Sequence, residues 1–346
     1  MNSDDQDPNG GIAPDKENGA SAAMLRKPEW LRIQLTSGAA YADVQRTLRE
    51  GRLNTVCAEA RCPNLHECWD RRKTATFMIL GEVCTRGCRF CAVKSGRPRL
   101  DGVWTGELAV DRDEPRRVAE AAASMGLRHV VITMVTRDDL ADGGAGILAE
   151  TVRRVREASP ACGVEVLSSD FDGNQAALAT LVDSRPDIIG HNLETVRRLT
   201  PQVRSRSTYE GSLAFLARAR ALVEARESGT VGLSGEGGHR SAGSQVAGPR
   251  RLVRIKSSLM LGLGETREEI LAAMDDLRAA GVDMCNLGQY LQPTREQLPV
   301  QKYWSPEEFA ELKQEGLRRG FRHVESGPLV RSSYHAEESA GAAGAD

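Results

Sequence analysis

Residues 75–93 read ATFMILGEVCTRGCRFCAV and place three cysteines directly after a β-rich run over Thr74–Leu80. The spacing of Cys84, Cys88 and Cys91 is C-x3-C-x2-C. Three thiolates so close together on a loop that leaves a strand can bind one face of an iron–sulfur cluster. Because a [4Fe-4S] cluster normally takes four cysteines, a set of three predicts one iron that is open to a substrate or cofactor. A structural zinc loop is the alternative. Zinc sites favour two cysteine pairs that are separated by a longer spacer, however, and no second pair follows at a suitable distance.

A second group of three cysteines precedes this stretch, in CAEARCPNLHEC over residues 57–68. Cys57, Cys62 and Cys68 have the spacing C-x4-C-x5-C, and His66 is a possible fourth ligand by proximity. The three could instead be core cysteines of an N-terminal cap, but three buried free thiols within twelve residues are an improbable coincidence. The group therefore predicts a second metal site.

Composition and charge exclude several classes of protein. The 346 residues carry 46 Lys and Arg against 48 Asp and Glu, so a net charge of −2 gives no electrostatic reason to bind nucleic acid or an anionic membrane. The longest apolar stretches, such as Leu213–Ala217 and Ile270–Met274, are too short to span a bilayer. The first twenty residues hold five acidic residues and no Arg, unlike a transit or signal peptide. We predict a cytoplasmic, monomeric protein with reduced thiols and with no nucleic-acid or membrane partner.

From about Lys73 onward, β-rich runs alternate with segments of helical spacing. The six expected strands are Thr74–Leu80, His129–Val135, Gly163–Ser168, Asp187–His191, Leu252–Leu261 and Val282–Tyr290. The expected helices are Pro115–Met125, Gly146–Ala158, Asn174–Val182, Tyr209–Arg226 and Thr266–Ala280. This alternation predicts an α/β protein with a parallel sheet and covering helices. It fits either an open or partial (β/α) barrel or a doubly wound sheet, and periodicity alone does not choose between them.

The ends of the chain and one internal segment depart from this pattern. Ser228–Gly248 is about half Gly or Ser, which predicts a flexible surface insertion, with a lid or docking loop as the alternative. The sequence thus divides into a disordered acidic tail (1–25), an N-terminal extension with Cys57, Cys62 and Cys68 (26–72), the sheet region with its insertion (73–325), and a C-terminal segment that ends in a disordered tail (326–346).

The succession of C-x4-C-x5-C and C-x3-C-x2-C resembles the lipoyl synthases of the radical S-adenosylmethionine (SAM) superfamily. The likeness extends through VTRDDLADGGA, HNLETVRRLTPQVR, KSSLMLGLGET, NLGQYLQPTREQLPV and GPLVRSSYHA, so it spans about Cys57 to Ala336. It implies a partial, TIM-like (β/α)6 barrel of the radical SAM type with N-terminal and C-terminal extensions.

The resemblance also implies the chemistry of both cysteine groups. The cluster of Cys84, Cys88 and Cys91 would bind SAM at its open iron and cleave it to methionine and a 5′-deoxyadenosyl radical. The other group, Cys57, Cys62 and Cys68, would hold an auxiliary [4Fe-4S] cluster, with Ser332 of the Arg-Ser-Ser-Tyr motif as fourth ligand in place of a histidine. That cluster would be sacrificed to supply two sulfur atoms, inserted at C6 and C8 of an octanoyl chain on a lysine of a lipoyl-carrier domain, with one SAM used for each hydrogen removed. An alkoxide ligand is harder than thiolate and should leave iron more easily, which suits a cluster that is dismantled.

The implied partners are octanoylated lipoyl-carrier domains, a reduced electron donor, and an iron–sulfur carrier protein that repairs the auxiliary cluster.

Two other functions fit the cysteines. One is a radical SAM enzyme that inserts sulfur into a free small molecule, as biotin synthase does. The other is a non-catalytic iron–sulfur electron carrier or sensor.

Several matched residues are weaker candidates. The end of the fourth expected strand carries Asn192 and Glu194, and the fifth carries Lys256. Polar groups gather at the mouth of a barrel, so these residues are candidate contacts to SAM or substrate. Each could instead cap a helix or form a salt bridge. The charged residues Arg137–Asp139 follow the second strand at the same rim, with a solvated loop as the alternative.

Gln289 and Tyr290 also end a strand and belong to these weaker candidates. Gly262–Gly264 is read as a strand-to-helix turn rather than a nucleotide-binding loop. Cys162 and Cys285 stand apart from both groups and are predicted to be packed thiols.

Overall fold

The structure is a computed structural model that describes residues 25–32, 39–59, 62, 64–65, 68, 76–100, 103–104, 110–229 and 252–333. Four predictions therefore fall wholly or largely outside the described residues. They concern the acidic tail, the body of the Gly- and Ser-rich insertion, the tail after Glu337, and His66.

An eight-stranded sheet forms the centre of the molecule, in the order β1-β2-β5-β6-β7-β8-β9-β10. Neighbouring strands from β2 to β10 are parallel, and β1 is antiparallel to β2. The strands are β1 (Asn54–Thr55), β2 (Thr76–Ile79), β5 (His129–Met134), β6 (Gly163–Leu167), β7 (Ile188–Gly190), β8 (Arg254–Leu261), β9 (Met284–Gln289) and β10 (His323–Gly327). A separate antiparallel pair consists of β3 (Arg99–Leu100) and β4 (Val103–Trp104).

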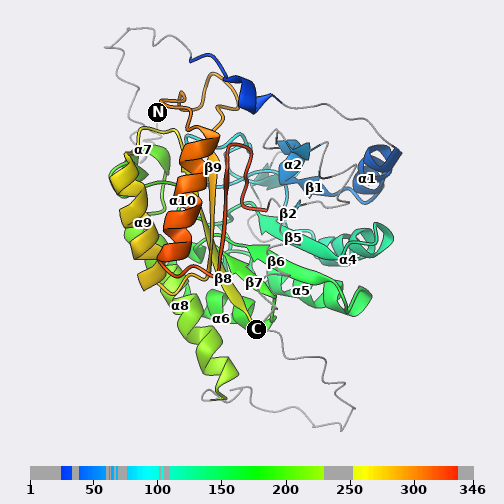
Figure 1. Cartoon of the computed structure of the whole chain (residues 1–346). Helices are drawn as coiled ribbons and strands as arrows, with labels where there is room; N and C mark the ends of the chain where they lie inside the picture. Colours follow the sequence, from blue (N-terminus) through cyan, green and yellow to red (C-terminus); the bar gives the residue numbers. More distant parts are fainter. Residues whose placement is uncertain are drawn as a thin grey trace, which may run out of the picture.

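Helices cover the outside of this sheet (Figure 1). The larger ones are α4 (Glu114–Ser124), α5 (Ala145–Ala158), α6 (Gln175–Asp183), α8 (Tyr209–Glu227), α9 (Arg267–Ala279) and α10 (Pro306–Arg318). The N-terminal part adds η1 (Glu29–Leu31), α1 (Ala39–Glu50) and α2 (Val56–Glu59), and short helices η4 (Phe171–Gly173) and α7 (Thr200–Val203) lie in the loops. In the described part of the chain, no helix combines the length and apolar character that crossing a membrane requires.

The strand order decides between the two predicted architectures. From β1 to β10 the spatial order follows the chain order without reversal, except for the separate β3–β4 pair. A doubly wound sheet reverses its strand order at a switch point, whereas a barrel advances in one direction with its right-handed crossovers on one side. The sheet ends at β1 and β10, so it is a partial (β/α) barrel, as predicted.

All six predicted strands and all five predicted helices are present. The predicted strand number was too small, because β10 extends the parallel sheet beyond β9 and the two-residue β1 pairs with the outer side of β2. The strands β2 and β9 are buried along their whole length, as expected where helices cover one face and the barrel interior the other. Gly126 and Gly281 follow α4 and α9 with φ of +62° and +79°, the left-handed conformation that commonly ends helices.

A buried carboxylate fixes the chain where β2 ends and the C-x3-C-x2-C loop begins. Leu80 has a φ of +70°, and its backbone N–H donates to Glu114 Oε2 at 2.8 Å. Its side chain packs on Gly144, where an added Cβ would lie 2.2 Å from Leu80 Cδ1. Glycine at 144, with a φ of +88°, therefore lets the loop of β5 approach the end of β2.

We predict a pH-dependent stability from Glu114. Burial raises its pKa to about 7, and the Leu80 amide offsets this only in part. The folded state thus favours the neutral acid, so this contribution to stability is full below the unfolded-state pKa and is lost as pH rises through about 7. Glu114→Gln keeps an acceptor for Leu80 without a charge. Relative to wild type, the free energy of unfolding of Glu114→Gln should rise by up to about 3 kcal/mol between pH 5 and pH 8, as measured by chemical denaturation. The same difference in free energy of unfolding at both pH values would contradict this.

Candidate functional site

The loop after β2 folds back on itself around the C-x3-C-x2-C cysteines. The backbone N–H of Cys84 donates to Lys94 O, and Gly96 N–H donates to Cys84 O, both at 2.9 Å. Within this closed loop, Cys91 N–H donates to Cys88 O at 3.0 Å. The three cysteines are free and partly exposed, so the loop presents all three thiols in a short, braced segment.

The geometry of this loop fits an iron–sulfur cluster. Burial raises the pKa of the Cys91 thiol to about 11, and the charges of Cys88, Cys84 and the nearby Glu194 add to that rise. The three thiols thus lie in one loop, within the range at which their charges affect one another. The Arg86 N–H also lies 3.4 Å from Cys84 Sγ, the type of contact that stabilises a ligating sulfur.

A site for a single metal ion requires that the side chains of its ligands converge on one point. In the part of the chain that the structure describes, no three His, Cys, Asp or Glu side chains converge as ligands of one ion. A [4Fe-4S] cluster does not need such convergence, because each thiolate binds a different iron.

The other cysteine group lies beside β1 and β2. Cys57 belongs to α2 and is buried, whereas Cys62 and Cys68 are partly buried. The backbone N–H of Cys62 donates to Cys57 O at 3.0 Å, and Cys68 N–H donates to Asn64 O at 2.9 Å. These contacts hold Cys62 beside Cys57 and Cys68 beside Asn64.

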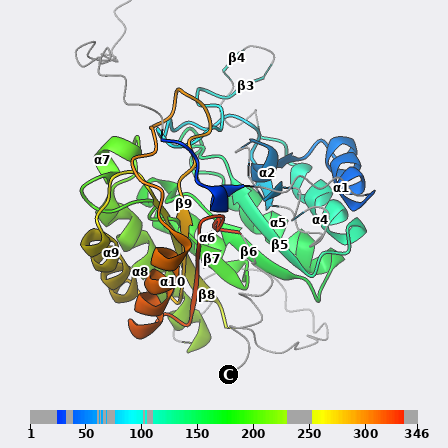
Figure 2. The same ribbon diagram turned by 45° about the horizontal axis from the view of Figure 1, so that its top comes forward.

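The C-terminal segment reaches this second group from the far side of the sheet. After β10 the chain, drawn in red in Figures 1 and 2, turns back across β9 toward α2 and β2. Asn64 Nδ2 donates to Leu329 O at 2.6 Å. Burial raises the pKa of Cys62, and the positive charge of Arg331 counteracts that rise, which places the guanidinium near the thiol. Residues from opposite ends of the chain thus meet at the C-x4-C-x5-C segment.

Two neighbouring serines of this segment differ in their contacts. Asn286 Nδ2 on β9 donates to the carbonyls of Arg331 and Ser332 at 3.0 and 3.2 Å. The Ser333 hydroxyl accepts a hydrogen bond from Thr76 Oγ1 at 2.9 Å. The Ser332 hydroxyl makes no hydrogen bond to any residue that the structure describes. Of the two serines, Ser332 therefore has the hydroxyl that is available to a ligand.

Asn192 and Glu194 follow β7, and Glu194 is near enough to Cys91 to affect the pKa of that thiol. Glu194 adopts a φ of +71° and bridges to Leu259 on β8. Burial raises its pKa, while Arg204 and a hydrogen bond from Asn192 counteract the rise. Arg204 Nη1 donates to Asn192 O at 3.2 Å, and its buried Nε has no partner among the described residues. The sequence reasoning missed Arg204, because an arginine in a loop carries no signal of its own.

Lys256 lies deeper in the barrel. Its Nζ is 2.9 and 3.1 Å from the two carboxylate oxygens of Glu165 on β6, and both residues are 2% exposed. His129 Nε2 is 3.8 Å from the same carboxylate. The salt bridge that the sequence left open as an alternative is therefore present, and a contact from Lys256 to SAM or substrate stays a prediction.

The pair gives a stability prediction. Lys256→Met leaves the Glu165 carboxylate buried without its partner, and we expect the free energy of unfolding to fall by about 3–5 kcal/mol. Lys256→Met with Glu165→Leu removes both charges and should recover most of that loss in the same denaturation experiment. A single variant as stable as wild type, but with weaker SAM binding, would instead make Lys256 a contact residue.

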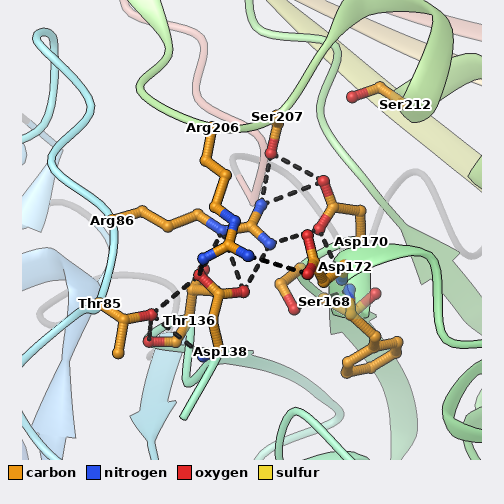
Figure 3. A network of polar contacts seen from close by, with 12 residues as sticks. Thr85, Arg86, Thr136, Asp138, Ser168, Asp170, Asp172, Arg206, Ser207 and Ser212 are labelled. Atoms are coloured by element: carbon orange, nitrogen blue, oxygen red, sulfur yellow. Dashed lines mark hydrogen bonds and ion pairs between the residues drawn. The ribbon is translucent and has the colours of Figure 1, made fainter. Parts of the chain in front are cut away.

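Arg137 is buried and Asp138 and Asp139 are partly buried, so the predicted alternative of a solvated loop is wrong. Arg137 is 1% exposed, and its Nε and Nη2 each lie 2.8 Å from an oxygen of Asp139. Asp138 turns instead toward Arg86 of the first cysteine loop, where Asp170 also binds (Figure 3).

The predicted glycine turn and the two isolated cysteines are structural, and Gln289 makes structural contacts as well. Gly262 and Gly264 have φ of +111° and +110° in the turn from β8 to α9, which confirms the predicted strand-to-helix turn. Gln289 Nε2 donates to three backbone carbonyls, and its Oε1 accepts from Trp304 N–H. Cys162 and Cys285 are 2% and 0% exposed within the core, as predicted.

Comparison with known proteins agrees with this geometry. The family model "Radical SAM superfamily" matches residues 78–240, and "N-terminal domain of lipoyl synthase of Radical_SAM family" matches residues 5–62. The chain is 54% identical over 314 residues to the lipoyl synthase of Shouchella clausii, covering 91% of this chain and 90% of that protein. The chain belongs to the lipoyl synthase family. The lipoyl synthase of Bacillus subtilis is 53% identical over 314 residues, with 91% and 93% covered.

Lipoyl synthases are sulfurtransferases that use SAM and two [4Fe-4S] clusters, which agrees with the two cysteine groups. Among solved structures, methylornithine synthase is 13% identical with a TM-score of 0.46, covering 85% of this chain and 82% of that one.

Proposed function

We propose that this chain inserts two sulfur atoms, at C6 and C8, into an octanoyl group carried on a lysine of a lipoyl-carrier domain. Membership of the lipoyl synthase family supports the reaction class. The observation that carries the residue assignment is the contact of Asn64 with Leu329, at 2.6 Å, which brings the Arg-Ser-Ser motif to the C-x4-C-x5-C segment. A serine near three cysteines from the other end of the chain fits the ligand set of an auxiliary cluster.

In this proposal the two cysteine groups have separate roles. When bound, one cluster supplies an electron to cleave SAM and the other supplies sulfur. Cys84, Cys88 and Cys91 hold the first through three thiolates and leave one iron open, while the Arg86 N–H steadies Cys84 Sγ. The set of Cys57, Cys62, Cys68 and Ser332 holds the second.

The polar residues beside the first loop bind the cofactor and substrate. Glu194 lies close enough to Cys91 to raise its pKa, so its carboxylate and the Asn192 amide can accept hydrogen bonds from hydroxyl or ammonium groups of SAM. Arg204, whose buried Nε lacks a partner among the described residues, offers a donor to a carboxylate in the same place. Lys256 stays a predicted contact, although its ammonium already pairs with Glu165.

The partners follow from the proposed reaction. They are octanoylated lipoyl-carrier domains as substrate, a reduced electron donor, and an iron–sulfur carrier protein that restores the auxiliary cluster after turnover. We also propose that the enzyme works as a monomer in the cytoplasm. The balanced charge of the sequence gives it no reason to bind nucleic acid or an anionic membrane.

The test is anaerobic turnover with SAM, a strong reductant and an octanoyl-lysine peptide, followed by mass spectrometry of the peptide. The proposal expects the sulfur-containing product from the peptide and none from free octanoate. Product from free octanoate alone would favour insertion into a small molecule. An absence of 5′-deoxyadenosine from fully reconstituted protein would favour an electron carrier or sensor.

A further inference from the structure

Arg86 stands midway between Cys84 and Cys88, yet the residue is only 6% exposed. Its guanidinium donates to Asp138 through Nε at 2.9 Å and through Nη2 at 2.7 Å. It donates to Asp170 through Nη2 at 2.7 Å and through Nη1 at 3.0 Å. One arginine thus binds two carboxylates, each by two hydrogen bonds, as Figure 3 shows.

The groups around Arg86 come from three different loops of the barrel. Asp138 follows β5, Asp170 follows β6, and Ser207 precedes α8. The Ser207 hydroxyl accepts from Arg86 Nη1 and donates to Asp170 Oδ2 at 2.7 Å. Thr85 Oγ1, the neighbour of Arg86 in the loop, donates to Asp138 Oδ2 at 3.1 Å. The side chain therefore ties the cysteine loop to the ends of two adjacent strands.

Charge makes this arrangement strong. Burial alone would raise the pKa of both aspartates, but hydrogen bonds and charge from Arg86 hold the pKa of Asp170 and of Asp138 below the usual range. Both carboxylates therefore stay ionised against the guanidinium. The planar fork of arginine can bind two carboxylates at once, whereas the ammonium of lysine acts as a point charge.

The backbone of Arg86 transmits this constraint to the cysteines. Its N–H lies 3.4 Å from Cys84 Sγ, and its carbonyl accepts a hydrogen bond from Ser95 Oγ at 3.2 Å. Ser95 also pairs with Cys84 in an isolated β-bridge. A side chain held by two aspartates thus fixes the peptide that faces the first ligating sulfur.

We propose that Arg86 is a positioning residue, whose ion pairs with Asp138 and Asp170 hold the C-x3-C-x2-C loop in its metal-binding conformation and aim the Arg86 N–H at Cys84 Sγ. The proposal rests on the proposed function, because that function places a [4Fe-4S] cluster on this loop. It adds that the placement of the three thiols depends on ion pairs in which none of them takes part. Loss of the contact should weaken cluster retention and change the electronic state of the cluster.

The test isolates this loop by replacing Cys57, Cys62 and Cys68 with alanine, so that only the cluster of the Arg86 loop remains. Arg86→Met is compared in this background with Arg89→Met. Arg89 is the matched control, because it lies in the same loop, is exposed, and among the described residues donates from its side chain only to Gln202 O at 3.4 Å. Arg86→Lys keeps the charge without the fork.

Three readouts are recorded for each variant. The first is the rate of iron loss to a chelator after anaerobic reconstitution, and the second is the reduction potential of the cluster by electron paramagnetic resonance. The third, which needs no metal, is hydrogen exchange of the Cys84 and Gly96 amides before reconstitution. Thermal unfolding of each variant checks the fold as a whole.

Arg86→Met should lose iron roughly tenfold faster than Arg89→Met, with Arg86→Lys in between, because groups that orient metal ligands commonly contribute that much to retention. Its potential should move to more negative values, since a hydrogen bond to a cluster sulfur favours the reduced state. Its loop amides should exchange faster. Equal rates, potentials and exchange in Arg86→Met and Arg89→Met would overturn the proposal.

Two other failures of this experiment can be distinguished from failure of the proposal. If Arg86→Met fails to fold because two carboxylates are left buried, Arg86→Met with Asp138→Asn and Asp170→Asn removes the charges and is judged by the same criteria. If the background protein binds no iron at all, the proposed function fails. The exchange rates of Cys84 and Gly96 then still decide whether Arg86 holds the loop.

Discussion

SAM cleavage should disappear when Cys84, Cys88 and Cys91 are replaced together by alanine. These thiolates are the only protein ligands proposed for the cluster that passes an electron to the sulfonium, and the loop that carries them is closed by its own backbone hydrogen bonds. Because Arg86 anchors the loop independently of the thiols, we expect the variant to fold. Anaerobic assay of 5′-deoxyadenosine should find none above the level without enzyme, and iron should fall to about four per chain.

The matched variant replaces Cys57, Cys62 and Cys68, and it should also retain about four irons per chain. It should still form 5′-deoxyadenosine, because the loop of the other cluster and the contacts around Glu194 are unchanged. It should form no lipoyl product, since the proposed sulfur source is gone. Lipoyl product from this variant would exclude the auxiliary cluster as donor, and 5′-deoxyadenosine from the other would exclude the C-x3-C-x2-C loop as the site of SAM cleavage.

Ser332→Ala should cleave SAM but form little or no lipoyl product. Three cysteines can still hold the auxiliary cluster, so iron content should stay close to wild type, with water or another exogenous ligand in place of the serine. Turnover should be lost because the serine is proposed to bind the iron that must leave when sulfur is delivered. Iron analysis, 5′-deoxyadenosine and product are measured on the same sample.

Ser333→Ala is the control for this experiment. Its hydroxyl already accepts a hydrogen bond from Thr76 at the start of β2, so its removal should cost about 1 kcal/mol of stability and leave turnover largely intact. A dead Ser333 variant beside an active Ser332 variant would show that the wrong serine is assigned. Activity in both would show that neither serine is a required ligand.

The alternation of apolar runs was enough to locate most of the sheet. The six predicted strands consist mostly of buried residues, and each is followed by a helix or turn signal. The strand β10, His323–Gly327, was missed because its sequence HVESG is polar and only Val324 is buried. The two-residue β1 is too short to show any period. The choice of a barrel over a doubly wound sheet came from strand order, which periodicity does not contain.

The site was predictable where its chemistry lies in local spacing. Both cysteine groups could be recognised because their members are close in sequence. The partners of Arg86 could not, because Asp138 and Asp170 are 52 and 84 residues away and a charged residue in a loop reads as solvated. The same applies to Lys256, whose partner Glu165 is 91 residues away. Which buried charges pair depends on the folded barrel, so the pairs cannot be predicted from composition.

The central claim is that the sulfur in the product comes from the chain's own auxiliary cluster. The most direct measurement reconstitutes the enzyme with ³⁴S-sulfide, removes free sulfide, and runs a single turnover on an octanoyl-lysine peptide with unlabelled sulfide in solution. We predict that mass spectrometry finds both product sulfurs labelled in wild type, and no sulfur-containing product when Cys57, Cys62 and Cys68 are alanine. Unlabelled product from the first turnover would contradict the account.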